Sequence, residues 1–432
     1  MTLVVMLFLY VALLSLHGFL ISRCLSRWGR IKGWACGIRR LWFGAYVLFS
    51  SFPVLGTILP DLPLRYLFQK VGNLWLGFIL YHGGLLLLLY LLGLMLRLFC
   101  RKMSLEGKGH GAILCLSTLG ALFIFGYGLF HAQQTKVVSY ELWVRKPLSS
   151  GDVVSLRDAS QEQEAWEREG LEEEAWEREG MKAEALEEED QDMTLVLIGD
   201  LHLGVNSYLS TTKRLVELVN AQHPDVVLVA GDIFTSCYKG LDHPEDYAKA
   251  LCQIEAKQGV YGIYGNHDVE EALFGGFAIT PVSKAFRSSE MEAFMKACSF
   301  QMLEDTLVTL PGGIQLAGRL DGEKAGDGTK NRLSAKELLS GADQSLPIFV
   351  LEHEPVDYQN LKEAGADVVL SGHTHAGQMF PGNLVVPFFN ENPWGHRIVQ
   401  GMDTFVTAGV GYYGPPMRVG TDSEVTVIHV HF

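Results

Sequence analysis

Four long apolar segments in the first third of the chain constrain its fold more than any other feature. They cover residues 2–22, 41–60, 74–96 and 112–131, and each has close to the roughly 20 residues that a helix needs to cross a bilayer. The third contains the uncharged run LLLLLYLLGLML. None shows the polar face of a helix that packs in a water-soluble core. We therefore expect residues 1–132 to form an all-α membrane domain with four spans; four buried core helices are the alternative.

Basic residues on the connecting loops predict how the spans are oriented, because positive charges remain on the cytoplasmic side of a membrane. Two loops are rich in them: Arg23, Arg27, Arg30, Lys32, Arg39 and Arg40 after the first span, and Arg97, Arg101, Lys102 and Lys108 after the third. The loop between the second and third spans has only Arg65 and Lys70, opposed by Asp61. We therefore expect an integral, multi-pass protein of the plasma or inner membrane, with everything after His131 outside the cytoplasm.

One ionisable residue, His82, lies within the third span. Ionisable side chains inside a bilayer can mark a transport path. No aspartate or glutamate lies in another span to serve as its partner. We therefore interpret His82 as a hydrogen-bonded packing residue, with a transport role as the alternative.

The acidic charge of the chain is concentrated in a tandem ten-residue repeat. The sequence reads QEQEAWEREG, LEEEAWEREG and MKAEALEEED from residue 161, and residues 161–192 hold 15 acidic and 3 basic residues. The formal net charge is −14, so the remainder of the chain is close to neutral. Ten residues do not bring equivalent positions onto one helix stripe at 3.6 residues per turn. We interpret residues 151–192 as a solvated acidic insertion or spacer; a cation-collecting or partner-docking segment is the alternative.

Charge and cysteine content argue against two further classes of protein. Nucleic-acid binding requires clustered Lys and Arg, and the soluble part of the chain shows no such basic face. The seven cysteines are scattered and odd in number, which is not typical of a disulfide framework or a zinc ribbon. We therefore expect no nucleic-acid partner, and the sequence leaves the oligomeric state open.

Beyond the last span the sequence predicts an α/β domain. Residues 136–144 alternate apolar and polar side chains as a strand does. From residue 193 onward, short apolar runs alternate with segments of helical spacing such as 211–223. The expected strands are 194–199, 226–230, 260–264, 347–351, 367–370, 404–407 and 424–430. Short buried runs separated by helices are typical of a sheet whose faces are covered by helices.

Five short motifs that could bind metal follow these expected strands. They are DLH at 200–202, GD at 231–232, GNHD at 265–268, HEP at 353–355 and GHTH at 372–375. Functional groups of open α/β sheets gather at the carboxyl ends of strands, so the five motifs can meet in one cleft. Their side chains offer carboxylate, amide and imidazole ligands without a thiolate, which suits divalent manganese, iron or zinc. The alternative, coincident polar residues in loop turns, would have to account for all five.

The set DLH, GD, GNHD, HEP and GHTHAGQ resembles the motifs of the calcineurin-like metallophosphoesterases, in particular their membrane-anchored branch. The tail AGVGYYGPPMRVGTDSEVTVIHV is similar to the C-terminal region of that branch. The resemblance covers about Lys136 to Phe432, apart from the acidic insertion, which departs from the family pattern. It implies an α/β domain with a four-layer αββα sandwich, built from residues 133–150 and 193–432, and a site for two divalent metal ions.

The resemblance also implies roles for individual residues. The residues expected to hold the first metal are Asp200, His202, Asp232 and His375, and those expected to hold the second are Asp232, Asn266, His353 and His373. His267 would be the catalytic histidine, and Asp268 would orient its ring. For Arg418, both a phosphate contact and a structural salt bridge remain open.

Together these residues predict a membrane-anchored phosphoesterase. Two metal ions about 3.5–4 Å apart would clamp phosphate oxygens and activate a bridging hydroxide for in-line attack on phosphorus. A histidine beside the leaving oxygen would donate a proton, a step worth about 10²–10⁴ in rate. The expected substrate is a phosphate monoester, diester or pyrophosphate that is lipid-linked or part of the envelope; some relatives cleave the pyrophosphate of a lipid-A precursor. A non-catalytic membrane scaffold with a phosphoesterase-like binding domain is the alternative.

Overall fold

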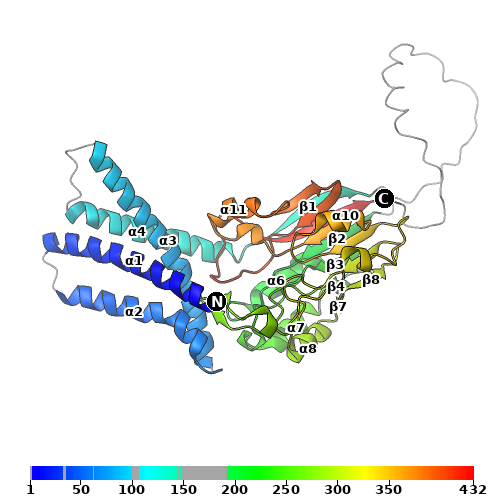
Figure 1. The fold of residues 1–432 in the computed structure, drawn as a ribbon, viewed down its shortest axis with the longest axis horizontal. Helices are drawn as coiled ribbons and strands as arrows, with labels where there is room; N and C mark the ends of the chain where they lie inside the picture. Colours follow the sequence, from blue (N-terminus) through cyan, green and yellow to red (C-terminus); the bar gives the residue numbers. More distant parts are fainter. Residues whose placement is uncertain (1, 33–35, 62, 100–106, 145, 147–191) are drawn as a thin grey trace, which may run out of the picture.

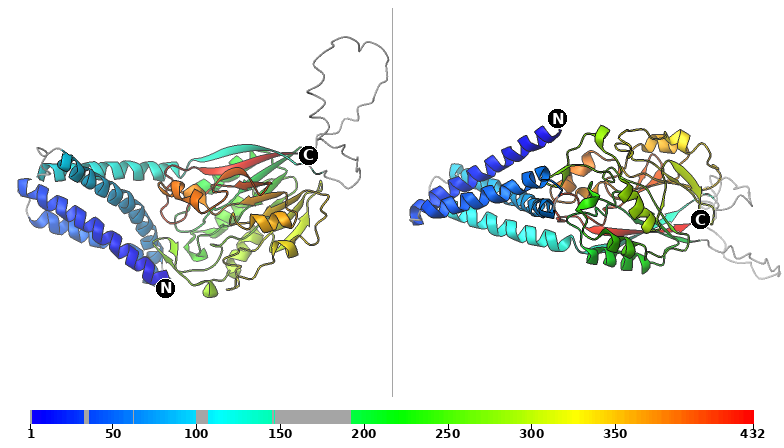
Figure 2. Two further views of the ribbon diagram at one scale, coloured as in Figure 1. Left: turned by 45° about the horizontal axis from the view of Figure 1, so that its top comes forward. Right: turned by 90° about the horizontal axis from the view of Figure 1, so that it is seen from below.

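The computed structural model describes residues 2–32, 36–61, 63–99, 107–144, 146 and 192–432. The chain has two parts, a bundle of four long helices and an α/β domain that lies at one end of the bundle (Figures 1 and 2). The acidic repeats that the sequence predicts to be a spacer lie outside the described residues.

Four helices form the bundle, and each is long and apolar enough to cross a membrane. They are α1 (Thr2–Lys32), α2 (Cys36–Ile58), α3 (Pro63–Phe99) and α4 (Gly107–His131). Large apolar side chains such as Phe8, Leu98 and Phe123 are exposed on the outside of the bundle. Exposed apolar surface of this extent is typical of a helix bundle whose solvent is lipid. The expected all-α membrane domain is confirmed, although α3 begins well before the predicted span.

A small polar cluster lies inside this apolar bundle. The His17 Nε2 and His82 Nδ1 atoms are 2.8 Å apart, and both side chains are buried. The other ring nitrogen of His82 lies 3.3 Å from the Ser117 hydroxyl and 3.2 Å from that of Thr118. The structure therefore supports the interpretation of His82 as a hydrogen-bonded packing residue, and it supplies the partner in α1 that the sequence analysis missed.

Two six-stranded sheets form the α/β domain. In spatial order, the first contains β1 (Thr135–Trp143), β14 (Ser423–His431), β2 (Met193–Ile198), β3 (Val226–Val229), β4 (Val260–Gly262) and β7 (Gln301–Met302). The second contains β12 (Gly395–Val399), β13 (Met402–Val406), β11 (Val368–Ser371), β10 (Ile348–Leu351), β9 (Gln315–Gly318) and β8 (Thr306–Thr309). Most neighbours run parallel, and the antiparallel pairs are β14–β2, β12–β13 and β8–β9.

Helices cover the outer face of each sheet, which gives four layers. The first sheet carries α6 (Leu209–Asn220), α7 (Pro244–Leu251) and α8 (Ser289–Ala297), and the second carries α9 (Ala335–Leu338) and α10 (Tyr358–Glu363). Successive side chains of a strand point to opposite faces, and β2 divides accordingly. Val196 and Ile198 pack against the helices, whereas Leu195 and Leu197 pack between the sheets. The expected four-layer αββα sandwich is confirmed.

Short elements at the ends of the strands complete the domain. They are η1 (Tyr238–Gly240), β5 (Leu273–Phe274), β6 (Phe277–Ala278), η2 (Val282–Lys284), η3 (His375–Gly377), α11 (Gly382–Val385) and η4 (Val386–Phe388). Two of them, β5 and β6, pair as an antiparallel hairpin shortly after the GNHD motif.

This β5–β6 hairpin packs against the helix bundle. The Phe274 ring meets the Tyr10 ring of α1 edge to face, with ring centroids 5.3 Å apart. In α2, the Thr57 hydroxyl donates a hydrogen bond to the carbonyl oxygen of Leu273 at 2.8 Å. Phe274 also shares a buried cluster with Leu76 of α3. Three of the four bundle helices therefore hold the chain that follows the GNHD motif.

Candidate metal centre

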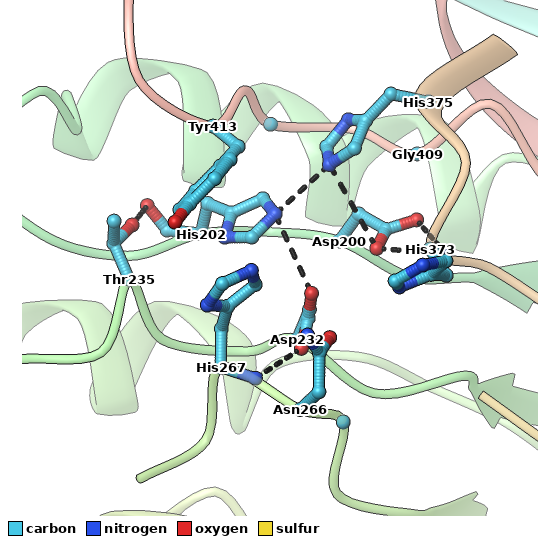
Figure 3. Close-up of polar contacts among 12 residues, drawn as sticks. Asp200, His202, Asp232, Thr235, Asn266, His267, His373, His375, Gly409 and Tyr413 are labelled. Atoms are coloured by element: carbon cyan, nitrogen blue, oxygen red, sulfur yellow. Dashed lines mark hydrogen bonds and ion pairs between the residues drawn. The ribbon is translucent and has the colours of Figure 1, made fainter. Parts of the chain in front are cut away.

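All five motifs of the sequence analysis lie at the carboxyl ends of strands. In the first sheet, Asp200, Asp232 and Asn266 follow β2, β3 and β4. In the second sheet, His353 and His373 follow β10 and β11. The two sheets face each other, so these strand ends bring their side chains together in one place, which we call the cleft; Figure 3 labels most of these side chains.

The first group of potential metal ligands comprises Asp200, His202 and His375, and their ligand atoms lie within 4.8 Å of one another. The Nε2 atoms of the two histidines are 2.9 Å apart. His375 Nε2 also lies 3.9 Å from a carboxylate oxygen of Asp200. All three side chains are buried.

The second group comprises Asp232, His353 and His373, again with ligand atoms within 4.8 Å of one another. His353 Nε2 lies 3.3 Å from Asp232 Oδ2 and 3.1 Å from Asn266 Oδ1. The same Asp232 oxygen lies 3.7 Å from His202 Nε2 of the first group. Asp232 is therefore positioned between the two groups.

The backbone around these side chains is strained. Left-handed φ angles, which non-glycine residues seldom adopt, occur at Asp200 (51°), His202 (46°), Asp232 (52°), His373 (73°) and His375 (51°). Each such residue costs about 1–3 kcal/mol, and strain of this kind clusters at functional sites. Close approach adds a further constraint, since a Cβ on Gly265 would overlap the carboxylate of Asp232.

The electrostatics of the cleft favour a cation. Burial raises the pKa of Asp200 to about 7; His353 lowers it and the Asp232 carboxylate raises it. Burial also opposes ionisation of Asp232, but the rings of His353 and His267 outweigh this effect and hold its pKa well below the ordinary value. Two buried carboxylates in one site repel each other, and a shared cation relieves that repulsion.

The donor set fits divalent metal ions. Carboxylate oxygens and imidazole nitrogens are ligands that manganese, iron and zinc share. His353 Nδ1 lies 2.7 Å from the carbonyl oxygen of Ala230, to which it can donate, and this leaves the lone pair of Nε2 facing Asp232. The Nδ1 atom of His202 is buried without a hydrogen-bond partner among the described residues. Carbonyl-held imidazoles of this kind are typical of metal-binding histidines.

The expected role of Asp268 stays a prediction, and its carboxylate makes its hydrogen bonds with the backbone. Its two carboxylate oxygens accept backbone hydrogens from Phe234 at 2.8 Å and Gly265 at 2.7 Å, so Asp268 holds the turn. No hydrogen bond joins its carboxylate to the His267 ring in the described part of the chain. The Nδ1 atom of that ring instead lies 2.9 Å from the Ser236 hydroxyl.

Ser236 connects His267 to a buried ion pair. Its hydroxyl lies 3.1 Å from Oε2 of Glu271, which pairs with Lys324 Nζ at 2.9 Å. Burial raises the pKa of Glu271, and the Lys324 ammonium opposes that rise. A serine has one hydrogen to donate, so its donation to the ionised Glu271 leaves its oxygen to accept the Nδ1 hydrogen of His267. The Nε2 atom of His267 then faces the cleft.

Two further residues of the site escaped the sequence analysis or were interpreted differently. The Tyr413 ring stacks on the His267 ring with centroids 4.2 Å apart, and its hydroxyl accepts a hydrogen bond from Ala278 N at 2.6 Å in the β5–β6 hairpin. Arg418 forms no salt bridge among the described residues, and the phosphate contact considered from the sequence stays a prediction. Its buried guanidinium donates to backbone carbonyl oxygens, among them those of Ala408 at 2.8 Å and His375 at 3.2 Å.

The structure is thus a four-layer αββα domain with candidate metal ligands, carboxylate and imidazole groups, at its strand ends. Residues 193–377 match the model of the calcineurin-like phosphoesterase family. This part of the α/β domain is therefore similar to that family, in agreement with the resemblance that the sequence motifs indicated.

Similar proteins include membrane proteins and a pyrophosphatase. A transmembrane protein with metallophosphoesterase domain from Danio rerio is 33% identical over 252 residues, which are 55% of this chain and 52% of the relative. A protein of the same description from Bos taurus is 28% identical over 238 residues, covering 54% and 52%. The UDP-2,3-diacylglucosamine pyrophosphatase LpxG of Chlamydia trachomatis is 24% identical over 220 residues, covering 43% and 64%. The chain thus spans about half the length of the first two relatives.

Proposed function

We propose that the protein is a membrane-anchored, metal-dependent phosphoesterase. The observation that carries this proposal is the position of Asp232 between two groups of potential ligands, with one oxygen 3.7 Å from His202 and 3.3 Å from His353. A single carboxylate that faces two such groups suits a pair of cations a few ångströms apart. The match to the calcineurin-like phosphoesterase family supports the same assignment.

The proposed ligands form two sets that share Asp232. The first comprises Asp200, His202, Asp232 and His375, and the second comprises Asp232, Asn266, His353 and His373. Divalent ions at these positions would supply electrostatic stabilisation of the phosphate and a water of lowered pKa. The residues around them hold the ligands in place: His373 N donates to both oxygens of Asp200 at 3.0 Å, and His267 N donates to Asp232 at 2.8 Å.

His267 is proposed to protonate the leaving oxygen. Its Nε2 faces the cleft, while Nδ1 is held by the Ser236 hydroxyl. A ring that carries both protons is cationic; burial lowers the pKa of His267 well below its ordinary value, and the Asp232 carboxylate opposes that change. Stacking on Tyr413 restricts the ring to one orientation. The chain thus provides a positioned general acid beside the ligands.

The proposed substrate class is a phosphate monoester, diester or pyrophosphate linked to a lipid. Support comes from the contacts that connect the cleft with the bundle. Tyr413, which stacks on His267, accepts a hydrogen bond from Ala278 N, and Ala278 belongs to the hairpin that packs on α1, α2 and α3. The similarity to a pyrophosphatase of a lipid precursor points in the same direction. The side of the membrane on which the domain lies stays a prediction from the loop charges.

The test is a hydrolysis assay in which the full chain, loaded with manganese, is reconstituted in phospholipid vesicles. We expect release of phosphate or of a phosphorylated product from an aryl phosphate monoester or diester, a phosphatidic acid or a long-chain alkyl pyrophosphate, and loss of this activity with a chelator. A protein that binds two equivalents of metal and hydrolyses none of these would favour a non-catalytic scaffold and contradict the proposal.

A further inference from the structure

An exposed apolar segment follows the metal-site histidines of the second sheet. After η3 the chain runs through α11 and η4, and residues 379–389 (MFPGNLVVPFF) contain no charged side chain. Five apolar residues are largely exposed: Phe380 (51%), Leu384 (57%), Val385 (46%), Phe388 (83%) and Phe389 (80%). Phenylalanine and leucine are usually buried in a folded domain. Several of them exposed together mark an interaction surface, which we call the 380–389 segment.

Backbone hydrogen bonds tie this segment to the end of the helix bundle. Phe380 N donates to the carbonyl oxygen of Val419 at 2.8 Å, and Arg418 N donates to that of Gly128 at 3.0 Å. Gly128 lies in the last turn of α4, which ends at His131. In α3, the Tyr81 hydroxyl donates to the carbonyl oxygen of Phe380 at 2.9 Å. Two of the spanning helices therefore fix the position of the segment.

These hydrogen bonds to α3 and α4 also determine where the segment lies relative to a membrane. The last turns of α4 still expose the apolar side chains Phe123 and Phe130. Lipid therefore surrounds α4 nearly to its end, where the segment is attached. Both views agree that α11 lies at the bundle end of the α/β domain, beside the end of α4 (Figures 1 and 2). The exposed side chains of the segment thus lie close to residues of α3 and α4 that the sequence predicts to be in the membrane.

We propose that the 380–389 segment inserts its apolar side chains into the surface of the bilayer as a second membrane contact beside the four spans. Short apolar and aromatic elements bind membranes in this way when their polar side remains in water. The segment has no Lys or Arg, so its occupant is the acyl region of the lipid and not an anionic headgroup. His375, a proposed metal ligand, lies five residues before Phe380. This contact would hold the cleft close to the bilayer. Given the proposed function, it would favour substrates that are embedded in the bilayer.

Depth-dependent fluorescence quenching tests this contact. The full chain with its native cysteines replaced and Phe388→Cys introduced is labelled with an environment-sensitive dye and reconstituted in uncharged phosphatidylcholine vesicles. We expect a spin-labelled acyl chain in the vesicle to quench the dye at least fivefold more strongly than it quenches the same dye at Val356→Cys. Val356 is a matched control because it is exposed (40%) and lies two residues before α10, a helix that is away from the bundle (Figure 1). Equal quenching at the two positions would overturn the proposal.

A second chain copy on this surface is the competing occupant, and cross-linking of the Phe388→Cys variant to itself without lipid quenching would identify it and overturn the proposal. Because quenching needs no turnover, it is independent of the proposed function. A further experiment links the membrane contact to the proposed function. The activity of the double variant F388S/F389S on a lipid-embedded phosphate ester should fall at least fivefold, while its activity on a water-soluble aryl phosphate is unchanged. Equal activity of the variant and the unmodified chain on the lipid-embedded ester would contradict the consequence for substrate choice.

Discussion

The helix bundle and the metal cleft both bury polar side chains, but they do so with opposite chemistry. In the bundle, His17 and His82 form hydrogen bonds with each other and with neutral hydroxyl groups. In the cleft, the carboxylates Asp200 and Asp232 are buried next to imidazole nitrogens, two of which lie 2.9 Å apart. The bundle cluster satisfies itself with donors and acceptors already present in the chain, whereas the cleft combines acceptors that a cation would satisfy. Buried polarity alone therefore does not identify a ligand site; the balance of charge and donors does.

The largest expected effect tests the cleft. Asp232→Asn keeps the shape of the side chain but removes the charge between the two ligand groups. We expect activity on an aryl phosphate to fall at least about 10²–10³-fold, the loss typical when one electrostatic contact with a transition state is removed. Steady-state rates at saturating manganese measure it. Asp242→Asn, which changes a carboxylate whose side chain is 95% exposed, is the control, and a fully active Asp232→Asn would remove the two-metal interpretation.

A smaller effect tests how the cleft positions the proposed general acid, His267. Ser236→Ala removes the hydroxyl between His267 and Glu271. We expect about 10–10²-fold slower hydrolysis of an alkyl phosphate, whose poor leaving group needs a proton, but little change for an aryl phosphate with a good leaving group. Glu271→Gln should shift the two rates in the same pattern. A uniform loss on both substrates would show that Ser236 only supports the fold.

The bundle cluster should respond in the opposite way to the cleft. His82→Leu alone leaves the buried His17 without its partner, and we expect it to lower the free energy of unfolding by about 1–3 kcal/mol. The double variant H17L/H82L removes both polar rings and should cost less than the single one. Denaturation of the protein in mixed micelles measures both. A double variant that is far less stable than the single one would indicate that the cluster binds something beyond the chain.

The smallest effect concerns the edge of the first sheet. His431 lies 2.7 Å from Glu141 on β1 and 2.8 Å from Asp192, and these hydrogen bonds raise its pKa above the ordinary 6.5. A raised pKa stabilises the folded protein fully below pH 6.5, and that stabilisation is lost as the pH rises through the folded-state value. His431→Ala should therefore lower the melting temperature slightly at pH 5.5 and leave it unchanged at pH 9. An equal shift at both pH values would assign the effect to packing.

Much of the architecture could be predicted because its signal is local. Strands such as β2 and β10 are continuous apolar runs, and the motifs at their ends place Asp200 and His353 without reference to the rest of the chain. Strands without such a run could not be predicted. β9 reads QLAG and β7 has only two residues, so neither has a strand pattern of its own. Each becomes a strand by pairing with a neighbour in its sheet, β9 with β10 and β7 with β4.

Contacts between distant segments also escaped prediction. The Ser236 hydroxyl lies beside the His267 ring while the Asp268 carboxylate accepts backbone hydrogen bonds, and no spacing in the sequence reveals this contact. Tyr413 and Arg418 reach the cleft from a loop near the end of the chain. His17 contacts His82 because particular faces of α1 and α3 pack together. The apolar composition of the two helices does not reveal which faces these are.

Metal content tests the central claim most directly. The full chain, purified in mild detergent, loaded with manganese and desalted, should retain two equivalents of metal per chain by elemental analysis. The Asp232→Asn variant, which lacks the charge between the two ligand groups, should retain fewer. Less than one equivalent in the folded, unmodified protein would show that the convergent carboxylates and imidazoles do not form a two-metal site, and it would contradict the proposed function.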